Sequence, residues 1–198
     1  MMCAKDYRAQ AWQRLSGHWG AMVVIGLLYS ILSTALAYTF VGSLLLSGVL
    51  MIGLASATLA LLRTGDTRAE YLFDGFKANL TNALIASVLY NVFIVLWSLL
   101  FVIPGIVKSY SYAMTFYILR DNPDMPASDA ITESRRMMDG NKFRLFCLHL
   151  SFFGWILLCI LTLGILTLFV VPYMQTAQAA FYESLKSAQA PRDYFNEN

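Results

Sequence analysis

Charged residues are scarce in this chain, and long stretches of it contain none. Only 13 % of its 198 residues are Asp, Glu, Lys or Arg, whereas 58 % are hydrophobic. No charged residue occurs in Trp19–Leu62, Ala78–Val107 or Leu145–Tyr182. An ordinary soluble domain has about 25 % charged residues. The composition therefore excludes that class and predicts a protein embedded in a membrane.

The residue patterns of common enzymes and metal sites are also lacking. The three uncharged tracts contain no carboxylate, and the two histidines, His18 and His149, are far apart in the sequence. There is no HxxxH pair, no GxSxG turn and no phosphate-binding loop. The three cysteines follow no metal or disulfide spacing, so we interpret them as small apolar side chains. These absences predict a protein that is not an enzyme and uses no metal or cofactor.

A polybasic segment is missing as well. The net charge is only +2, and basic and acidic residues are mixed along the loops. Nucleic-acid binding depends on clustered positive charge. We therefore expect no nucleic-acid partner, and we expect the lipid bilayer to be the main surrounding.

The lengths of the uncharged tracts predict helical hairpins. A spanning helix needs about 20 apolar residues, and the first and third tracts have 44 and 38. The middle tract continues past Lys108 to Leu119, so each tract fits two crossings. Turn signals interrupt the tracts at Tyr38–Gly42, Pro104-Gly105 and Thr162–Gly164. We predict an all-α membrane protein with six transmembrane helices arranged as three hairpins.

The basic residues predict the orientation of this single domain, 1–198. Except for Lys108, they lie before the first crossing, after the second, after the fourth and after the sixth, which are all on one face. The positive-inside rule makes that face cytoplasmic, together with both termini. The predicted order is N-terminus (1–18), hairpin 1 (19–62), loop (63–79), hairpin 2 (80–119), loop with an amphipathic helix (120–142), hairpin 3 (143–182) and tail (183–198).

A short amphipathic segment accompanied by a glycine precedes each hairpin. These segments are Ala4–Leu15 before Gly17, Ala69–Phe76 around Gly75, and Ser128–Met138 before Gly140. We expect cytoplasmic interfacial helices with their apolar faces toward lipid. In the third, Ser128 fits an N-cap and Gly140 a C-terminal stop. The recurrence suggests a threefold internal repeat, although any hairpin that follows a juxtamembrane helix has this pattern.

A family resemblance covers nearly the whole chain and is densest from Leu96 to Tyr182. It rests on LWSLLFVIPGIVKSYSYAMTFYILRDNP, SDAITESRRMMDGNKFRLFCLHLSFFGW and TLGILTLFVVPYMQTAQAAFYESL. The motif residues are Pro104, Gly105, Tyr110, Tyr112, Pro123, Ala130, Ser134, Arg135, Met138, Gly140, Lys142, Phe146, Ser151, Phe152, Gly154, Trp155, Pro172 and Tyr173. The chain resembles the bacterial membrane proteins known as domain of unknown function 975. More distantly, it is similar to the membrane domain of some glycerophosphodiester phosphodiesterases, whose catalytic barrel it lacks. The resemblance implies a multi-pass protein of the bacterial cytoplasmic membrane and carries no reaction or substrate.

Lys108 is the one charge near the predicted outer face, a few residues beyond Pro104-Gly105. An ammonium group within a membrane is costly and therefore marks a candidate site. With a helix N-terminus at Gly105, it could hold a lipid phosphate or a carboxylate. The alternative is that its side chain extends to the outer interface.

Polar residues within the predicted crossings are the other candidate ligand contacts. They are Asn91, Tyr112, His149, Gln175 and Gln178. Such side chains could line a polar cavity, and His149 could relay a proton. The alternative is that they join neighbouring helices by hydrogen bonds.

A basic rim flanks the third amphipathic segment and consists of Arg135, Arg136, Lys142 and Arg144. Anionic headgroups attract such a rim by roughly 1 kcal/mol per basic residue. It fits a surface for anionic lipid or for an envelope protein. Ordinary positive-inside topology explains the same residues.

Two functions follow from these features. The first is binding or transport of a lipid or small amphiphile, favoured by the polar residues within the crossings and by helix breaks expected at Pro104 and Pro172. The second is an interaction or assembly protein that stabilises another envelope component. The lack of carboxylates in the crossings disfavours ion-coupled transport.

Overall fold

The computed structural model describes residues 4–37, 40–77, 80–100, 102–162 and 166–196. Every regular element within these ranges is a helix, which confirms the all-α prediction. The elements are α1 Ala4–Leu15, α2 Trp19–Ala37, α3 Phe40–Thr64, η1 Ala69–Phe73, α4 Asp74–Lys77, α5 Leu80–Leu100, α6 Val102–Tyr112, α7 Thr115–Asp121, α8 Ala127–Met137, α9 Lys142–Leu150, α10 Phe153–Leu161 and α11 Thr167–Asn196.

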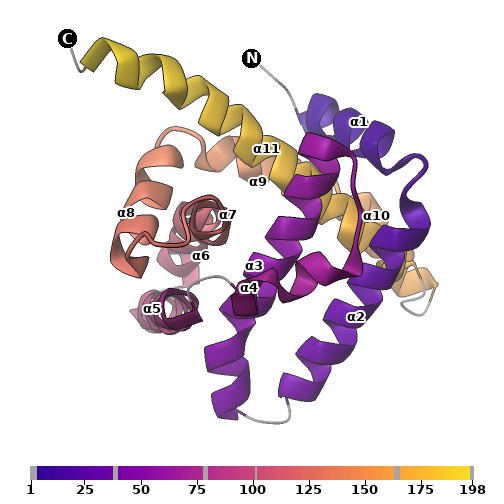
Figure 1. The fold of residues 1–198 in the computed structure, drawn as a ribbon, viewed down its shortest axis with the longest axis horizontal. Helices are drawn as coiled ribbons and strands as arrows, with labels where there is room; N and C mark the ends of the chain where they lie inside the picture. Colours follow the sequence, from indigo (N-terminus) through magenta and orange to yellow (C-terminus); the bar gives the residue numbers. More distant parts are fainter. Residues whose placement is uncertain (1–3, 38–39, 78–79, 101, 163–165, 197–198) are drawn as a thin grey trace.

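Helix α3 lies at the centre of the molecule, and α11 runs obliquely across the upper part of the view (Figure 1). Helices α2, α5, α7 and α11 all pack against α3, as does the short segment η1–α4. Small residues allow the closest approach. A Cβ atom at Gly53 would overlap the Leu72 carbonyl of η1, and one at Gly75 would overlap the Val49 carbonyl of α3. Glycine at both positions therefore seats η1–α4 directly against α3.

The three amphipathic segments form helices close to the predicted bounds. Helix α1 has the predicted bounds, and α8 begins one residue earlier than predicted. Gly17 and Gly140 have positive φ angles of 101° and 72°, as expected for glycines that end α1 and α8. The predicted N-cap at Ser128 is wrong because Pro126 occupies that position with an extended backbone. Gly75 lies inside α4 and serves close packing instead of ending a helix.

The apolar faces of α1 and α8 contact protein, which corrects the expectation that they face lipid. On α1, Tyr7, Ala11 and Leu15 are fully buried, and the helix packs mainly against α11. On α8, Ala130 and Ile131 are buried and the helix packs against α5, α6 and α7. Helix α11 covers the apolar face of α1, and helices α5, α6 and α7 cover that of α8, in place of lipid. Both amphipathic helices are therefore parts of the folded core.

The predicted turns lie near helix ends, with differences in detail. Helix α2 ends at Ala37 and α3 begins at Phe40, so Gly42 lies within α3 and is not the break. Pro104 and Gly105 lie in the first turn of α6, where proline is tolerated because those amides have no acceptor within the helix. Residues 38–39, 101 and 163–165 at the three turns lie outside the described part of the chain. At the third turn, α10 ends at Leu161, followed by Thr162.

The expected break at Pro172 is absent. Helix α11 continues through this residue from Thr167 to Asn196. Pro172 is buried, and a Cβ atom at Gly26 of α2 would lie 3.7 Å from its Cδ atom. The Thr176 hydroxyl donates to the Pro172 carbonyl oxygen over 2.7 Å. Packing against α2 therefore outweighs the loss of one helical hydrogen bond.

Two helical segments of the described chain are long and apolar enough to cross a membrane by themselves, Leu46–Thr64 and Lys142–Leu161. The number rises to four if two bent pairs each count as one span. One pair joins α1 to α2 with a bend of 104°, and the other joins Ala69–Phe76 to Leu80–Leu96 with a bend of 86°. The chain is thus compatible with a membrane protein that has two to four such spans.

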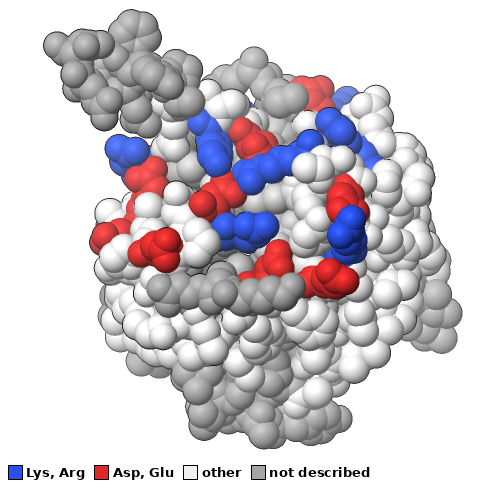
Figure 2. Space-filling model, in the orientation of Figure 1, with Lys and Arg blue, Asp and Glu red and all other residues white. Residues whose placement is uncertain are grey.

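Charged side chains are unevenly distributed on the face shown in Figure 2. Blue and red residues gather in the upper part of this face, whereas the described lower part is uncharged. In the same orientation, helix α1 and the C-terminal part of α11 lie in the upper part, and the end of α2 and the start of α3 lie at the bottom (Figure 1). The molecule therefore has a charged end and an apolar body on this face.

Candidate functional site

A cavity of about 350 Å³ lies between α5, α6 and α8. It is lined by Leu89, Phe93, Lys108, Tyr112, Ser128, Ile131, Thr132 and Arg135. Three of these residues, Lys108, Tyr112 and Arg135, are candidate site residues from the sequence. We refer to this space as the Lys108 cavity.

The Lys108 cavity has an apolar wall and a cationic wall. Phe93 packs against Tyr112 with their ring centroids 5.9 Å apart, and Tyr112 is only 3 % exposed. Lys108 and Arg135 both line the cavity and act on one another electrostatically. Lys142 of α9 adds a third positive charge acting on Lys108. An anion with an apolar part fits this combination of walls.

The place of Lys108 relative to Arg135 differs from the sequence-based expectation. The predicted topology puts Lys108 near the outer face and Arg135 at the cytoplasmic face, whereas the two line one cavity. Helix α6 has 11 residues, about 16 Å at 1.5 Å per residue, which is too short to separate them by a membrane thickness. Helix α8 also packs along α6 instead of lying apart from it.

Ser134 holds the break between α6 and α7 beside this cavity. Its buried hydroxyl donates to the Ser111 carbonyl oxygen over 2.9 Å and accepts from the Met114 amide over 3.2 Å. The chain between α6 and α7 would otherwise leave these buried backbone groups without partners. Ser134 was noted only as a motif residue in the sequence. Ser134 lies on the apolar face of an amphipathic helix, and that position could have indicated that its hydroxyl is buried and hydrogen-bonded.

A second predicted group comes together at His149. Its Nδ1 atom lies 3.3 Å from the Tyr110 hydroxyl, and Gln178 of α11 interacts with the same imidazole. The group joins α6, α9 and α11 through side-chain contacts. This arrangement matches the helix-joining alternative, in which polar side chains connect neighbouring helices.

The remaining predicted polar residues lie elsewhere. The Asn91 amide donates to the Ser87 carbonyl oxygen over 2.8 Å and to the Ser47 hydroxyl over 3.4 Å, so it joins α5 to α3. Gln175 is half-buried on α11, three residues before Gln178. The six predicted ligand contacts therefore do not form one seam.

The predicted basic rim is divided between two places. Arg135 and Lys142 lie near Lys108, whereas Arg136 and Arg144 line a separate cavity of about 470 Å³. Arg136 pairs with Glu133 over 3.0 Å. Arg144 donates to the Tyr7 hydroxyl over 2.9 Å and so ties α9 to α1. Arg144 is thus engaged in packing, while Arg135 faces the Lys108 cavity.

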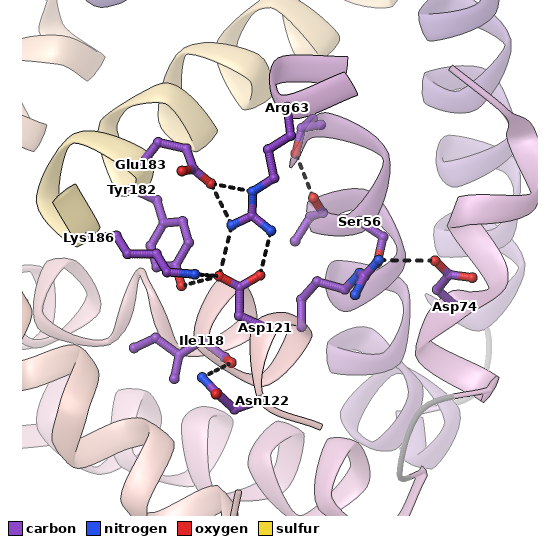
Figure 3. Close-up of polar contacts among 12 residues, drawn as sticks. Ser56, Arg63, Asp74, Ile118, Asp121, Asn122, Tyr182, Glu183 and Lys186 are labelled. Atoms are coloured by element: carbon purple, nitrogen blue, oxygen red, sulfur yellow. Dashed lines mark hydrogen bonds and ion pairs between the residues drawn. The ribbon is translucent and has the colours of Figure 1, made fainter. Parts of the chain in front are cut away.

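An ion-pair cluster around Asp121 was missed at the sequence level (Figure 3). Arg63 of α3 donates to both carboxylate oxygens of Asp121 over 2.8 Å and also to Glu183 over 2.7 Å. Lys186 and the Tyr182 hydroxyl bind the same Asp121 carboxylate. These residues are 58 to 123 positions apart from Arg63 in the chain. Nothing in their local sequence pattern indicates the pairing.

The charge state of Asp121 follows from these partners. Asp121 lies beyond the end of the predicted second hairpin, and its side chain is 7 % exposed. Burial alone would raise the pKa of its carboxyl group, but hydrogen bonds from Arg63 and Lys186 outweigh it and lower the pKa to about 2. Asp121 is therefore ionised at neutral pH and holds the ends of α3 and α7 against the middle of α11.

Among the residues that the structure describes, no group of three or more His, Cys, Asp or Glu side chains could hold a metal ion. Residues 99–189 match the family described as "Protein of unknown function (DUF975)". The family resemblance is thereby confirmed for this part of the chain, which includes α6 to α10 and most of the Lys108 cavity. No curated protein and no solved structure matches the chain. The distant resemblance to the membrane domain of glycerophosphodiester phosphodiesterases stays a prediction.

Proposed function

We propose that this chain, whose residues 99–189 match the DUF975 family, is a multi-pass protein of the bacterial cytoplasmic membrane that handles an anionic lipid or small amphiphile without a chemical reaction. The Lys108 cavity carries this proposal. It combines two cationic side chains, three hydroxyl groups and an apolar wall within about 350 Å³. Binding or transport of an amphiphile needs both kinds of wall.

The proposed topology has six crossings in three hairpins, with both termini in the cytoplasm and with an internal threefold repeat. The packing of α2 on α3 and of α5 on α6 supports the first two hairpins. The amphipathic segments before α2, α5 and α9 support the repeat. The gathering of charges at one end of the face in Figure 2 supports the cytoplasmic placement of the loops.

The topology is tested by cysteine labelling in a variant that lacks the native cysteines. A cysteine at Gly42 or Gly164 should react with an impermeant maleimide from outside the cell. A cysteine at Arg68, in a proposed cytoplasmic loop, should react only after the membrane is opened. Labelling of the Gly42 variant only after opening would contradict the six-crossing topology.

The ligand is tested by native mass spectrometry of protein released from nanodiscs that are made from the host membrane. The wild type should retain a small anionic adduct. Lys108→Gln and Arg135→Gln should each lose most of it, because each removes one of the cations lining the cavity. Arg68→Gln is the matched control, since Arg68 is exposed and pairs with Asp66 over 3.1 Å outside the Lys108 cavity.

An adduct that is retained equally in the Lys108→Gln, Arg135→Gln and control variants would contradict the binding site. A stoichiometric protein partner without any small adduct would favour the assembly function. One observation supports that alternative: α10 has no buried residue, and Leu161 and Ile160 are 80 % and 70 % exposed. Such an apolar helix surface can contact either lipid or a partner helix.

A further inference from the structure

Two adjoining cavities lie where α1 meets α2, α10 and α11, away from the Lys108 cavity. The first, of about 430 Å³, is lined by Lys5, Arg8, Ala9 and Gln13 of α1. The second, of about 350 Å³, is lined by Trp19, Trp155, Leu166, Phe169 and Val170. Trp12 and Tyr173 line both cavities. The two spaces are therefore neighbours, and one is polar and cationic whereas the other is apolar.

Trp12 and Tyr173 form the boundary between the two cavities. The Trp12 ring lies 5.3 Å from Trp19 and 5.8 Å from Tyr173, measured between centroids, and Trp155 lies 6.3 Å from Tyr173. Trp12 is 50 % exposed, although Ala11 and Leu15 on the same helix are fully buried. Aromatic residues of this kind concentrate where acyl chains meet headgroups. The aromatic wall therefore fits the junction between the tail and the head of a lipid.

Arg8 is held in a fixed position at the polar end. Its Nη1 atom donates to the Ser151 carbonyl oxygen over 3.2 Å, and its guanidinium lies 5.6 Å from the centroid of Phe152. The Tyr173 hydroxyl donates to the Arg8 carbonyl oxygen over 3.2 Å. The Arg8 Nε atom is buried and has no hydrogen-bond partner within the described structure. A buried guanidinium donor without an acceptor is costly unless an acceptor is supplied.

We propose that these adjoining cavities bind one anionic phospholipid of the surrounding bilayer. An acyl chain occupies the aromatic cavity, and the phosphate lies against Lys5 and Arg8. Both charged residues lining the polar cavity are basic, and no acidic residue of the described chain lines it. A zwitterionic headgroup gains less from two cations than a headgroup with net negative charge. This site rests on the proposed membrane location, but it is separate from the Lys108 cavity and does not depend on ligand binding there.

Tryptophan fluorescence gives a direct test, because three of the four tryptophans border the aromatic cavity. The full chain carrying Trp97→Phe is placed in phosphatidylcholine vesicles together with brominated phosphatidylglycerol or brominated phosphatidylcholine. Brominated phosphatidylglycerol should quench the fluorescence of the remaining tryptophans at a severalfold lower mole fraction than brominated phosphatidylcholine does. Lys5→Gln should reduce this preference about fivefold, as expected for the loss of one headgroup contact, and Arg8→Gln should reduce it further.

Arg14→Gln is the matched control, since Arg14 is exposed on the same helix and lines neither cavity. Lys5 is also exposed, so Lys5→Gln keeps the test valid if Arg8→Gln does not fold. Equal quenching by the two brominated lipids would overturn the proposal, as would equal loss of preference in Lys5→Gln and Arg14→Gln. Lys108→Gln should leave the quenching unchanged, so failure at one site is distinguishable from failure at the other.

Discussion

Arg63 at the end of α3 and Asp121 at the end of α7 form a bidentate ion pair across 58 residues of chain. Both nitrogen–oxygen distances are 2.8 Å, and the Asp121 side chain is 7 % exposed. Lys186 and Tyr182 of α11 bind the same carboxylate. One buried charge therefore connects the central helix to two others, and its removal is expected to weaken the whole charged end of the molecule.

Asp121→Asn should lower the stability of the protein. The substitution keeps the shape of the side chain but leaves Arg63 and Lys186 without their shared anion. Because Arg63 is 39 % exposed, we expect a loss of about 1–3 kcal/mol rather than the full cost of breaking a buried pair. The measurement is the midpoint of thermal unfolding in detergent. Asp66→Asn, which removes an exposed ion pair with Arg68, should cost less than about 1 kcal/mol. Equal losses in the two variants would contradict the role of Asp121.

The same carboxylate predicts a pH dependence of stability. Its pKa is about 2 in the folded protein against a reference value of 3.8. A lowered folded-state pKa contributes stability above the unfolded pKa, and this contribution disappears as the pH falls toward the folded pKa. The stability difference between wild type and Asp121→Asn should therefore be constant above about pH 5 and shrink between pH 4 and pH 2. Unfolding midpoints at pH 6, 4 and 3 measure it, and a difference that does not vary with pH would be inconsistent with this pKa.

Gly53→Ala and Gly75→Ala should each destabilise the protein. The added methyl group would overlap backbone carbonyl groups of Leu72 and Val49, which cannot rotate away as a flexible side chain can. We expect a cost of about 1–3 kcal/mol for each, typical of overpacking. Gly154→Ala is the control because the space around its Cβ position is open. Helix propensity alone should make that control neutral or slightly stabilising, by up to about 1 kcal/mol. If Gly154→Ala lowered the midpoint of thermal unfolding as much as Gly53→Ala and Gly75→Ala, the close packing of η1–α4 on α3 would be refuted.

Ser134→Ala should destabilise the break between α6 and α7. The change leaves the buried Met114 amide without its hydrogen-bond partner and removes the donor to Ser111. An unsatisfied buried polar group costs about 1–3 kcal/mol. Hydrogen–deuterium exchange should show faster exchange at residues 111–115, and Ser134→Thr should restore part of the protection. Ser109→Ala removes a hydroxyl bound only to the local Ile106 carbonyl oxygen and should leave this exchange unchanged.

Local sequence patterns were sufficient to predict several helix boundaries. Helix α1 has the predicted bounds, and Gly17 and Gly140 adopt positive φ angles after their helices. These features depend on a few neighbouring residues and on backbone conformations that only glycine adopts cheaply. Ser128 and Pro172 show the limit of such reasoning. Pro126 displaced the cap by two residues, and the contact of Pro172 with α2 kept α11 continuous.

The candidate sites depended more on tertiary structure. Residue type marked Lys108, Tyr112 and Arg135 as candidates, but only the packing of α8 along α5 and α6 brought them into one cavity. The same packing placed Lys108 and Arg135 at one cavity, although the predicted topology assigns them to opposite faces of the membrane. The Asn91 amide donates hydrogen bonds to Ser87 of α5 and Ser47 of α3, so this polar side chain connects the two helices. The pairing of Trp12 with Tyr173 and of Arg63 with Asp121 had no counterpart in any local pattern.

By itself, the sequence determined that the chain is helical and apolar enough for a membrane, and where many of its helices begin and end. Those properties follow from composition, tract length and local backbone preferences, which act within a few residues. Only the tertiary structure decided that the apolar faces of α1 and α8 contact protein, that Lys108 meets Arg135, and that Asp121 joins three helices. The physical reason is that the apolar face of a helix can be buried against lipid or against another helix. Which of the two it contacts depends on whether surfaces from distant parts of the sequence are complementary to it in shape and charge.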